Sequence, residues 1–346
     1  MRETSKTAPV PSAWKQAVAK HRQPNLRRSL WQLVNSVVPY LALWALMIWT
    51  LDQSYWLTLA LAVVAAGFLV RIFIIFHDCG HGSFFRSRRA NRLTEFVTGV
   101  LVFTPYRQWR YQHAVHHATS GDLDRRGTGE IWTLTVQEYL EASRWKRFSY
   151  RLVRNPFVLL ALAPSFVFLV QQRFPSRTLP KRERRGVHWT NGALLAIAVL
   201  MSLTIGIKAY VLIQLPVMML AAGAGVWLFY VQHQFEDVQW ERQTNWDYAQ
   251  AALHGSSFYK LPKVLQWFTG NIGFHHIHHL SPAIPNYNLE GCHKESPIFQ
   301  QVKPITLWRS MRSLSLRFWD EQRRKLVGYG RLRSVRREMS APRAGD

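Results

Sequence analysis

HHIHH, residues 275–279, places four imidazoles within five positions of this 346-residue chain. His275, His278 and His279 have the spacing H-x-x-H-H. On a helix, positions i, i+3 and i+4 lie on one face, so these three imidazoles can point at one position. His276 lies one residue off that face, and we expect it either to support the other imidazoles or to lie on the helix surface. The fold must then bring further ligands to this face.

Two earlier histidine groups supply such ligands. His113, His116 and His117 have the same H-x-x-H-H spacing, and His77 and His81 in HDCGH form an i, i+4 pair. Eight clustered imidazoles exceed the three protein ligands of a catalytic zinc ion, and they suit two ions with about four nitrogens each. Imidazole binds iron, copper, nickel and zinc, so the ligand type alone does not choose the metal. The three groups predict a metalloenzyme with a di-metal site.

The hydrophobic residues, 48% of the chain, are concentrated in long runs. Four runs reach the length of about 20 residues that crosses a bilayer; they are residues 31–51, 56–76, 189–207 and 210–231. They form two hairpins, because only residues 52–55 and 208–209 separate the members of each pair. The shorter apolar stretch at 96–103 is expected to be interfacial or re-entrant, and the stretch at 156–170 to be a helix that lies at the interface or dips into it. The pattern predicts an all-α integral membrane protein with four transmembrane helices.

Basic residues orient these helices. Residues 1–29 carry seven Lys or Arg, residues 173–188 carry six, and the chain after residue 231 carries sixteen. The two hairpin turns carry only Lys208, so the positive-inside rule places both turns outside and both termini in the cytoplasm. The net charge of +24 flanks apolar runs, and no nucleic-acid motif accompanies it. We therefore assign this charge to lipid headgroups and an acidic protein partner, not to nucleic acid.

Three regions follow from these patterns. We expect a basic cytoplasmic N-terminal segment over residues 1–30 and one membrane domain over 31–300, whose cytoplasmic cap holds the di-metal site. A basic cytoplasmic tail covers residues 301–346. Within the tail, ITLWRSMRSLSLRFW at 305–319 interleaves Arg with Leu, Trp and Phe. This pattern predicts a surface helix on lipid headgroups or, alternatively, a docking surface for an electron donor.

Four longer stretches resemble the membrane fatty-acid desaturases, and most closely their Δ12 (omega-6) branch. The resemblance covers residues 33–288, and it rests on HDCGHGSFF (77–85), HAVHHATSGDLDRRGTGEIWTLTVQEY (113–139), YVQHQFEDVQW (230–240) and GNIGFHHIHHLSPAIPNYNL (270–289). It implies a four-span helical fold with a non-haem di-iron centre. It also implies desaturation with O2 and two electrons from a separate donor.

Carried over by position, the resemblance assigns iron ligands. The eight histidines of the three groups match the family's boxes, and His233 matches an additional ligand seen in relatives. The H-x-x-x-H spacing of His77 and His81 favours the Δ12 and omega-3 side over the Δ9 acyl-CoA branch. One departure is Phe229, because the Δ9 branch has an Asn there that holds a water near one iron. That part of the site is expected to differ here.

The expected reaction introduces a cis double bond into an acyl lipid or acyl thioester, with Δ12 (oleoyl to linoleoyl) favoured. Omega-3 or other acyl desaturation, fatty-acyl hydroxylation and carotenoid or alkane oxygenation are alternatives on the same scaffold. A non-enzymatic zinc-binding membrane receptor is a remote alternative. The chain has no HPGG haem motif and no Gly-rich nucleotide-binding domain, so a ferredoxin or cytochrome b5 should supply electrons. A bacterial inner membrane is the expected location.

Carboxylates near the boxes should orient the imidazoles, as such partners do in metal sites. The candidates are Asp78, Asp122, Asp124, Glu236 and Asp237. The alternative for Asp122 and Asp124 is simple pairing with Arg125 and Arg126. Three aromatic residues near the boxes are candidate walls of an acyl tunnel, or else members of an interfacial belt; they are Trp109, Trp132 and Trp240.

Overall fold

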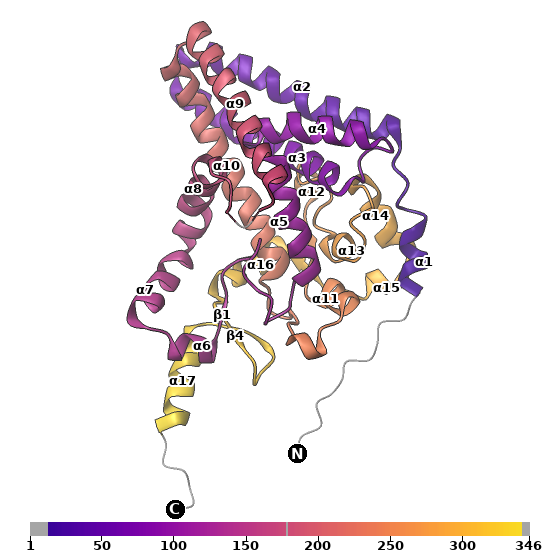
Figure 1. Ribbon diagram of the computed structural model, residues 1–346, viewed down its shortest axis with the longest axis vertical. Coiled ribbons are helices and arrows are strands. Elements are labelled where there is room, and N and C mark those ends of the chain that lie inside the picture. Colours follow the sequence, from indigo (N-terminus) through magenta and orange to yellow (C-terminus); the bar gives the residue numbers. More distant parts are fainter. Residues whose placement is uncertain (1–12, 178, 341–346) are drawn as a thin grey trace, which may run out of the picture.

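The computed structural model describes residues 13–177 and 179–340, and its longest elements are four apolar helices (Figure 1). Each is long enough to cross a membrane; they are α2 (Leu26–Leu51), α3 (Tyr55–His81), α9 (Lys181–Thr204) and α10 (Ile207–His233). They confirm the four predicted runs and their pairing as two hairpins. The second turn lies at Gly206 rather than at residues 208–209, because its φ of 84° is readily adopted by glycine.

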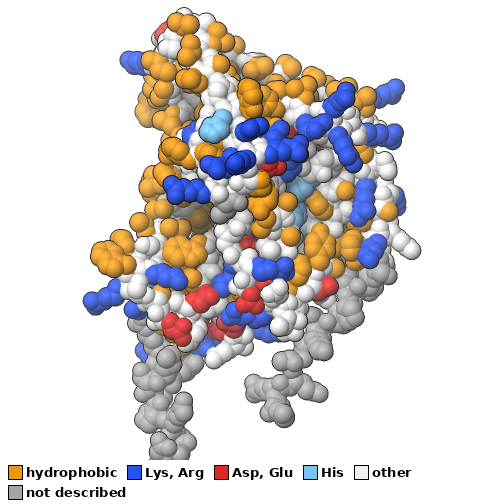
Figure 2. Space-filling model, in the orientation of Figure 1, with side chains coloured by type: hydrophobic (Ala, Val, Ile, Leu, Met, Phe, Trp, Pro, Cys, Tyr) orange, Lys and Arg blue, Asp and Glu red, His pale blue; other side chains and the backbone are white. Residues whose placement is uncertain are grey.

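Helix α3 lies at the centre of the membrane part. It packs against α2, α10 and α4 (Arg88–Leu101), and small buried residues such as Ala62 and Ala65 line it. Small side chains let helix backbones approach closely within a membrane. On α9, by contrast, Leu203 is 80% exposed, and Figure 2 shows hydrophobic side chains over the projecting end of the α9–α10 hairpin at the top of the view. These exposed apolar faces are the surface that lipid covers.

The two shorter apolar stretches do not add long helices. The first belongs to α4, which has 14 residues and is too short to span. The second forms a π-helical turn at Val158–Leu162 and continues into α8 (Ala163–Leu169). Together with α7 (Arg144–Val153), this second stretch is long and apolar enough to cross a membrane, but the two parts are bent by 66° relative to each other. Both stretches are therefore short or bent elements beside the main helices.

The remaining elements pack at the ends of α3 and α10 and form a cap. Its longest central helix, α5 (Tyr106–Thr119), contacts α3 and α9. The other cap helices are α1 (Ala13–Ala19), α6 (Val136–Glu141), α11 (Tyr248–His254), α12 (Lys263–Phe268), α13 (His275–Leu280), α14 (Asn286–Glu295), α15 (Pro297–Gln300), α16 (Leu307–Ser310) and α17 (Tyr329–Ser340). The cap thus gathers segments from many parts of the described chain.

Two small sheets supplement the helical fold within the cap. Strand β2 (Phe258–Lys260) pairs in parallel with β3 (Pro304–Thr306). In the other sheet, β4 (Phe318–Asp320) lies between β1 (Leu134–Thr135) and β5 (Lys325–Val327), parallel to the first and antiparallel to the second. The prediction of an all-α protein is thus correct for the membrane helices, and the cap adds short strands.

The tail forms part of this cap. The predicted surface helix over residues 305–319 is wrong, because this segment contributes β3, the short α16 and the start of β4. Phe318 and Trp319 are almost fully buried, and only Trp308, which is 84% exposed, has the surface position expected of a membrane-facing aromatic residue. Strand pairing with distant segments, which a local pattern does not encode, explains the difference. Residues 1–12 and 341–346 of the two predicted terminal regions lie outside the described part of the chain.

Candidate metal centre

Nine histidines converge into two adjacent groups at the ends of α3 and α10. We call the first the five-histidine cluster; it contains His77, His81, His113, His117 and His278. The second, the four-histidine cluster, contains His116, His233, His275 and His279. Within each cluster the candidate ligand atoms all lie within 4.8 Å of one another. Every histidine predicted as a ligand, including His233, therefore belongs to one of the two clusters.

Each H-x-x-H-H group is divided between the clusters. On α5, His116 belongs to the four-histidine cluster whereas His117 belongs to the five-histidine cluster. On α13, His278 and His279 are divided in the same way. Consecutive residues of an α-helix point about 100° apart, so an adjacent pair can serve two neighbouring ions. The expectation that each group points at a single position is therefore wrong, and α5 and α13 instead join the two clusters.

Distances between ring nitrogens fit ligands that share an ion. In the five-histidine cluster, His117 Nε2 lies 3.1 Å from Nε2 of both His113 and His278. In the four-histidine cluster, His233 Nε2 lies 3.2 Å from His116 Nε2. Two nitrogens that each lie about 2.1 Å from one ion and at a right angle are about 3.0 Å apart. The imidazoles are therefore arranged as a preformed ligand set.

Burial keeps the imidazoles of His278 and His279 neutral, as metal binding requires. It lowers the pKa of His278 and His279 well below 6.5, and the neighbouring imidazoles lower it further. The Nε2 atoms of His81 and His279 are buried without a hydrogen-bond partner among the described residues. A buried polar atom left unpaired is costly, and a bound ion would satisfy it. The donor chemistry of both clusters thus fits a transition metal.

Asp78 supports the five-histidine cluster. Its Oδ1 lies 3.1 Å from His77 Nδ1, which leaves the other ring nitrogen of His77 free to bind a metal. Its Oδ2 accepts hydrogen bonds from Asn286, at 2.6 Å from the backbone nitrogen and 2.8 Å from Nδ2. Sequence reasoning missed Asn286, although the residue lies within the stretch that resembles desaturases. The carboxylate and Asn286 together hold the orientation of His77.

The other candidate carboxylates pair with cations or backbone groups. Asp122 is buried, and its Oδ2 accepts a hydrogen bond of 2.6 Å from Arg125 Nε, as the alternative interpretation expected. The remaining three pair with residues outside both clusters, namely Asp124 with Arg242, Glu236 with Arg312 and Asp237 with Lys303. Glu236 and Asp237 are also exposed. Among the described residues, Asp78 makes the carboxylate contact to a clustered imidazole.

His276 occupies the interior of the cap. It is fully buried beside the rings of Phe258, His293 and Phe299, so the expectation of a helix-surface position is wrong. Its backbone nitrogen donates to the Ser257 carbonyl at 3.2 Å. Burial lowers the pKa of His276 to about 3, so the ring is neutral at physiological pH. The His276 side chain therefore packs against aromatic residues inside the cap.

A small cavity adjoins the four-histidine cluster. It has a volume of about 20 Å³, and His116, His233, Glu130 and Phe229 are among its lining residues. This volume can hold one water molecule. The Phe229 ring centre lies 5.1 Å from that of His116, so an aromatic ring forms part of the lining. Burial raises the pKa of Glu130 to about 7, and sequence reasoning missed this residue because it follows a Gly-containing loop rather than a histidine.

The three candidate tryptophans occupy different places. Trp109 stacks on His113, with ring centres 4.3 Å apart and an interplanar angle of 19°. Trp240 is one of the residues that line the small cavity. Trp132 lies edge-on against Tyr150 in the cap, with ring centres 5.1 Å apart. Of the three, Trp109 thus has the stacking contact to a clustered imidazole.

Comparisons with known proteins agree with this geometry. The family model described as fatty acid desaturase matches residues 54–306. A protein of Bacillus subtilis (strain 168) named fatty acid desaturase is 51% identical over 318 residues, which cover 92% of this chain and 90% of that protein. An sn-1 oleoyl-lipid 12-desaturase of Synechocystis is 26% identical over 242 residues, covering 65% of this chain and 64% of that protein. An endoplasmic reticulum omega-3 fatty acid desaturase of Vigna radiata is 29% identical over 244 residues, covering 63% and 59%.

The family match spans three of the four long helices completely and contains both histidine clusters. The similarity to the Bacillus protein extends over nearly the whole of both chains. Two adjacent histidine clusters at the ends of helices long enough to cross a membrane are compatible with a di-metal site of an oxidoreductase. The chain therefore belongs to the fatty acid desaturase family.

Proposed function

We propose that the two clusters hold a non-haem di-iron centre, and that the enzyme uses O2 and two electrons to introduce a cis double bond into an acyl chain. One observation carries this proposal: two all-histidine clusters lie side by side where apolar helices long enough to cross a membrane end. Bound iron would supply the oxidising power that an unactivated methylene requires, and the protein would supply position.

The residues of the two clusters have different tasks in this proposal. The five-histidine cluster would hold its ion firmly, because Asp78 orients His77 and Asn286 holds Asp78. The four-histidine cluster supplies one ligand fewer and adjoins a cavity large enough for one water. Catalytic metal sites typically keep a position free of protein ligands. We assign that open position to the four-histidine cluster.

Trp109 is the residue that we assign to the wall of the acyl site. It stacks on His113 on one side, and its ring lies 4.7 Å from that of Phe76 in the apolar interior. Burial contributes about 0.8 kcal/mol for each methylene but does not distinguish one methylene from the next. The shape of the walls must therefore set which carbon atoms face the metal.

Δ12 desaturation, which converts oleoyl to linoleoyl groups, is the regiochemistry that we propose. The H-x-x-x-H spacing of His77 and His81 and the similarity to a 12-desaturase support it. Omega-3 desaturation is the second candidate, because the Vigna omega-3 enzyme is similar to a comparable degree. The two candidates differ in substrate, since one acts on a monounsaturated and the other on a diunsaturated chain.

A separate acidic protein, a ferredoxin or cytochrome b5, is the electron donor that we propose. The charge of +24 supports this assignment. The inferred topology also supports it, because it places the cap and both termini on the cytoplasmic side of a bacterial inner membrane. Attraction between opposite charges is screened by salt. Turnover should therefore fall as ionic strength rises, and turnover insensitive to salt would contradict electrostatic docking.

Gas chromatography of fatty acids tests the proposed reaction directly. The wild type, His278→Ala and His188→Ala are expressed in a host that contains oleate. We expect a new 18:2 species from the wild type and from His188→Ala, whose histidine is exposed on α9, but none from His278→Ala. In a parallel culture supplied with linoleate, formation of 18:3 without any 18:2 from oleate, or a hydroxylated product alone, would contradict Δ12 chemistry. Purified protein that contains zinc and no iron would contradict the di-iron centre.

A further inference from the structure

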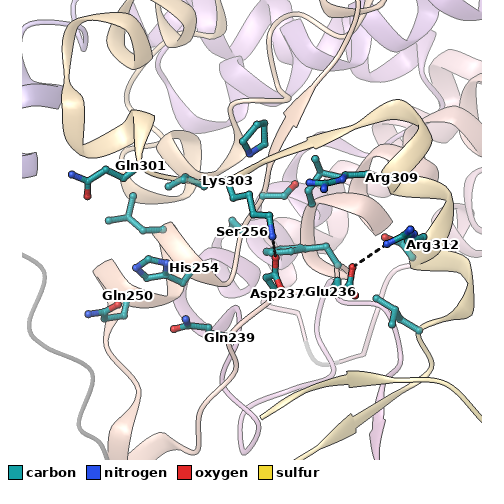
Figure 3. Close-up of a pocket in the computed structure, with 18 of the residues that line it drawn as sticks. Glu236, Asp237, Gln239, Gln250, His254, Ser256, Gln301, Lys303, Arg309 and Arg312 are labelled. Atoms are coloured by element: carbon teal, nitrogen blue, oxygen red, sulfur yellow. Dashed lines mark hydrogen bonds and ion pairs between the residues drawn. The ribbon is translucent and has the colours of Figure 1, made fainter. Parts of the chain in front are cut away.

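A second cavity, of about 610 Å³, lies in the cap beyond the end of α10 (Figure 3). Its lining comes from residues 235–239, 250–257 and 298–316, and both apolar and polar side chains contribute. The volume lies within the range of about 300–1,000 Å³ that is typical of small-molecule sites. None of the nine clustered histidines is among the lining residues. This cavity is therefore distinct from the metal centre.

The charged residues of this cavity leave one cation available. Lys303 Nζ pairs with Asp237 at 2.9 Å, and Arg312 pairs with Glu236 at 3.8 Å; Figure 3 shows both pairs as dashed lines. Arg309 lies on the same side of the cavity as Arg312 in that view, and its guanidinium has no ion-pair partner among the described residues. An anionic ligand would thus meet Arg309 without first displacing a carboxylate.

Two hydroxyl groups in the same lining have no partner. Ser256 and Ser257 are 0% and 1% exposed, and neither Oγ has a hydrogen-bond partner among the described residues. Figure 3 places Ser256 in the middle of the lining, between Lys303 and Asp237. A buried hydroxyl without a hydrogen bond costs free energy, so such groups normally meet a water or a ligand. The cavity therefore offers two hydroxyl groups for hydrogen bonding in addition to the Arg309 guanidinium.

The cavity lies close both to the apolar core of the membrane helices and to the peptide that carries the last group of histidines. Ile305 lines the cavity and also packs against the apolar core of the membrane helices, and the nearby Trp308 is exposed. Exposed tryptophans are common at the membrane–water interface. On the other side, the Ser257 carbonyl accepts a hydrogen bond from the His276 backbone. A ligand here would lie between the bilayer surface and the histidines of residues 275–279.

We propose that this cavity binds the phosphate-bearing polar end of the acyl carrier, with Arg309 as the phosphate ligand and Ser256 as a hydroxyl partner. This proposal rests on the proposed acyl-chain substrate and adds the group that would hold its polar end. The phosphate can belong to a glycerophospholipid or to a coenzyme A thioester. A fixed polar end would give the acyl chain the register that methylene burial alone does not supply.

Binding to the full-length protein in detergent tests the proposal without turnover. Isothermal titration calorimetry is run with dihexanoylphosphatidylglycerol and, separately, with coenzyme A. We expect one of the two probes to bind, which identifies the source of the phosphate. Arg309→Gln should weaken that binding about tenfold or more, as expected for the loss of one charge-assisted hydrogen bond. Arg144→Gln, which changes an exposed arginine on α7, should bind like the wild type.

Ser256→Ala provides the second variant. Because the hydroxyl has no partner among the described residues, its removal should not lower the melting temperature but should still weaken probe binding. Failure of both probes to bind, or equal affinity in the wild type and Arg309→Gln, would overturn the proposal. Product formation by the same wild-type preparation separates the two ideas. A preparation that makes desaturated product but binds neither probe contradicts only the cavity, whereas Arg309-dependent binding without product contradicts only the desaturase reaction.

Discussion

The five-histidine and four-histidine clusters share helices α5 and α13 but differ in ligand number and in support. The first receives two further ligands from α3, and Asp78 and Asn286 hold one of them in place. The second receives one further ligand, His233 from α10, and adjoins a cavity with room for a water. Under the proposed assignment, the five-histidine site is closed by protein ligands and the four-histidine site is open to an exogenous ligand.

Removal of one histidine from each cluster should have the largest effect. His279→Ala leaves three imidazoles in its cluster, whereas His81→Ala leaves four, as many as the other cluster has in the wild type. We expect His279→Ala to lose about half of its bound iron and His81→Ala to retain more, because metal affinity follows ligand number. Iron per chain, measured by plasma mass spectrometry with His188→Ala as control, checks this. Equal loss in both variants would contradict the difference between the clusters.

Asp78→Asn should weaken the five-histidine cluster selectively. Loss of a carboxylate that orients a ligating imidazole typically lowers metal affinity about 10–100-fold. The four-histidine cluster has no such carboxylate contact within the described part of the chain and should release its ion to a chelator at the wild-type rate. Chelator competition would therefore resolve one fast and one unchanged phase. Asp237→Asn, at an exposed carboxylate, is the matched control, and two equally accelerated phases would contradict selective support.

Acid should destabilise both clusters, because each contains buried neutral imidazoles. Burial lowers the pKa of His117 and His275 well below 6.5, so the folded protein keeps these imidazoles neutral while the unfolded chain takes up protons. The unfolded state then binds more protons below pH 6.5, and stability falls as the pH drops. We expect a lower melting temperature and less bound iron at about pH 5 than at about pH 7.5. A melting temperature that stays constant or rises on acidification would contradict the buried neutral state.

Glu290→Gln tests how far the support of the five-histidine cluster extends, and its effect should be the smallest. Glu290 bridges Lys263 and Lys294, each at 2.7 Å, on the helix that carries Asn286. These cations and their hydrogen bonds lower the pKa of Glu290 to about 2. Both lysine partners are largely exposed, so we expect a loss of less than about 1 kcal/mol at neutral pH and unchanged iron content. Thermal denaturation of Glu290→Gln, with Glu141→Gln as the control, measures this loss of stability. A loss of iron would show that surface charges also position Asp78.

Features that depend on local sequence were predictable. The four long helices follow from continuous apolar runs, and the histidines were recognisable because their spacing repeats. The partners of the histidines were less accessible. Asn286 contacts Asp78 across more than two hundred residues, and β1 pairs with β4 across a comparable distance. Such contacts require the folded arrangement, so the tail was expected to be a helix and Asn286 was missed.

The amino-acid sequence alone determined that this protein has four long apolar helices and eight regularly spaced histidines suited to metal binding, because length, hydropathy and spacing act along the chain. Only the tertiary structure decided how the histidines divide between two clusters. Adjacent residues of α5 and α13 point in different directions, and the partners that meet them come from α3 and α10. The same packing buries His276, holds Asp78 against His77 and places a cavity beside the four-histidine cluster. These features arise from the meeting of distant segments.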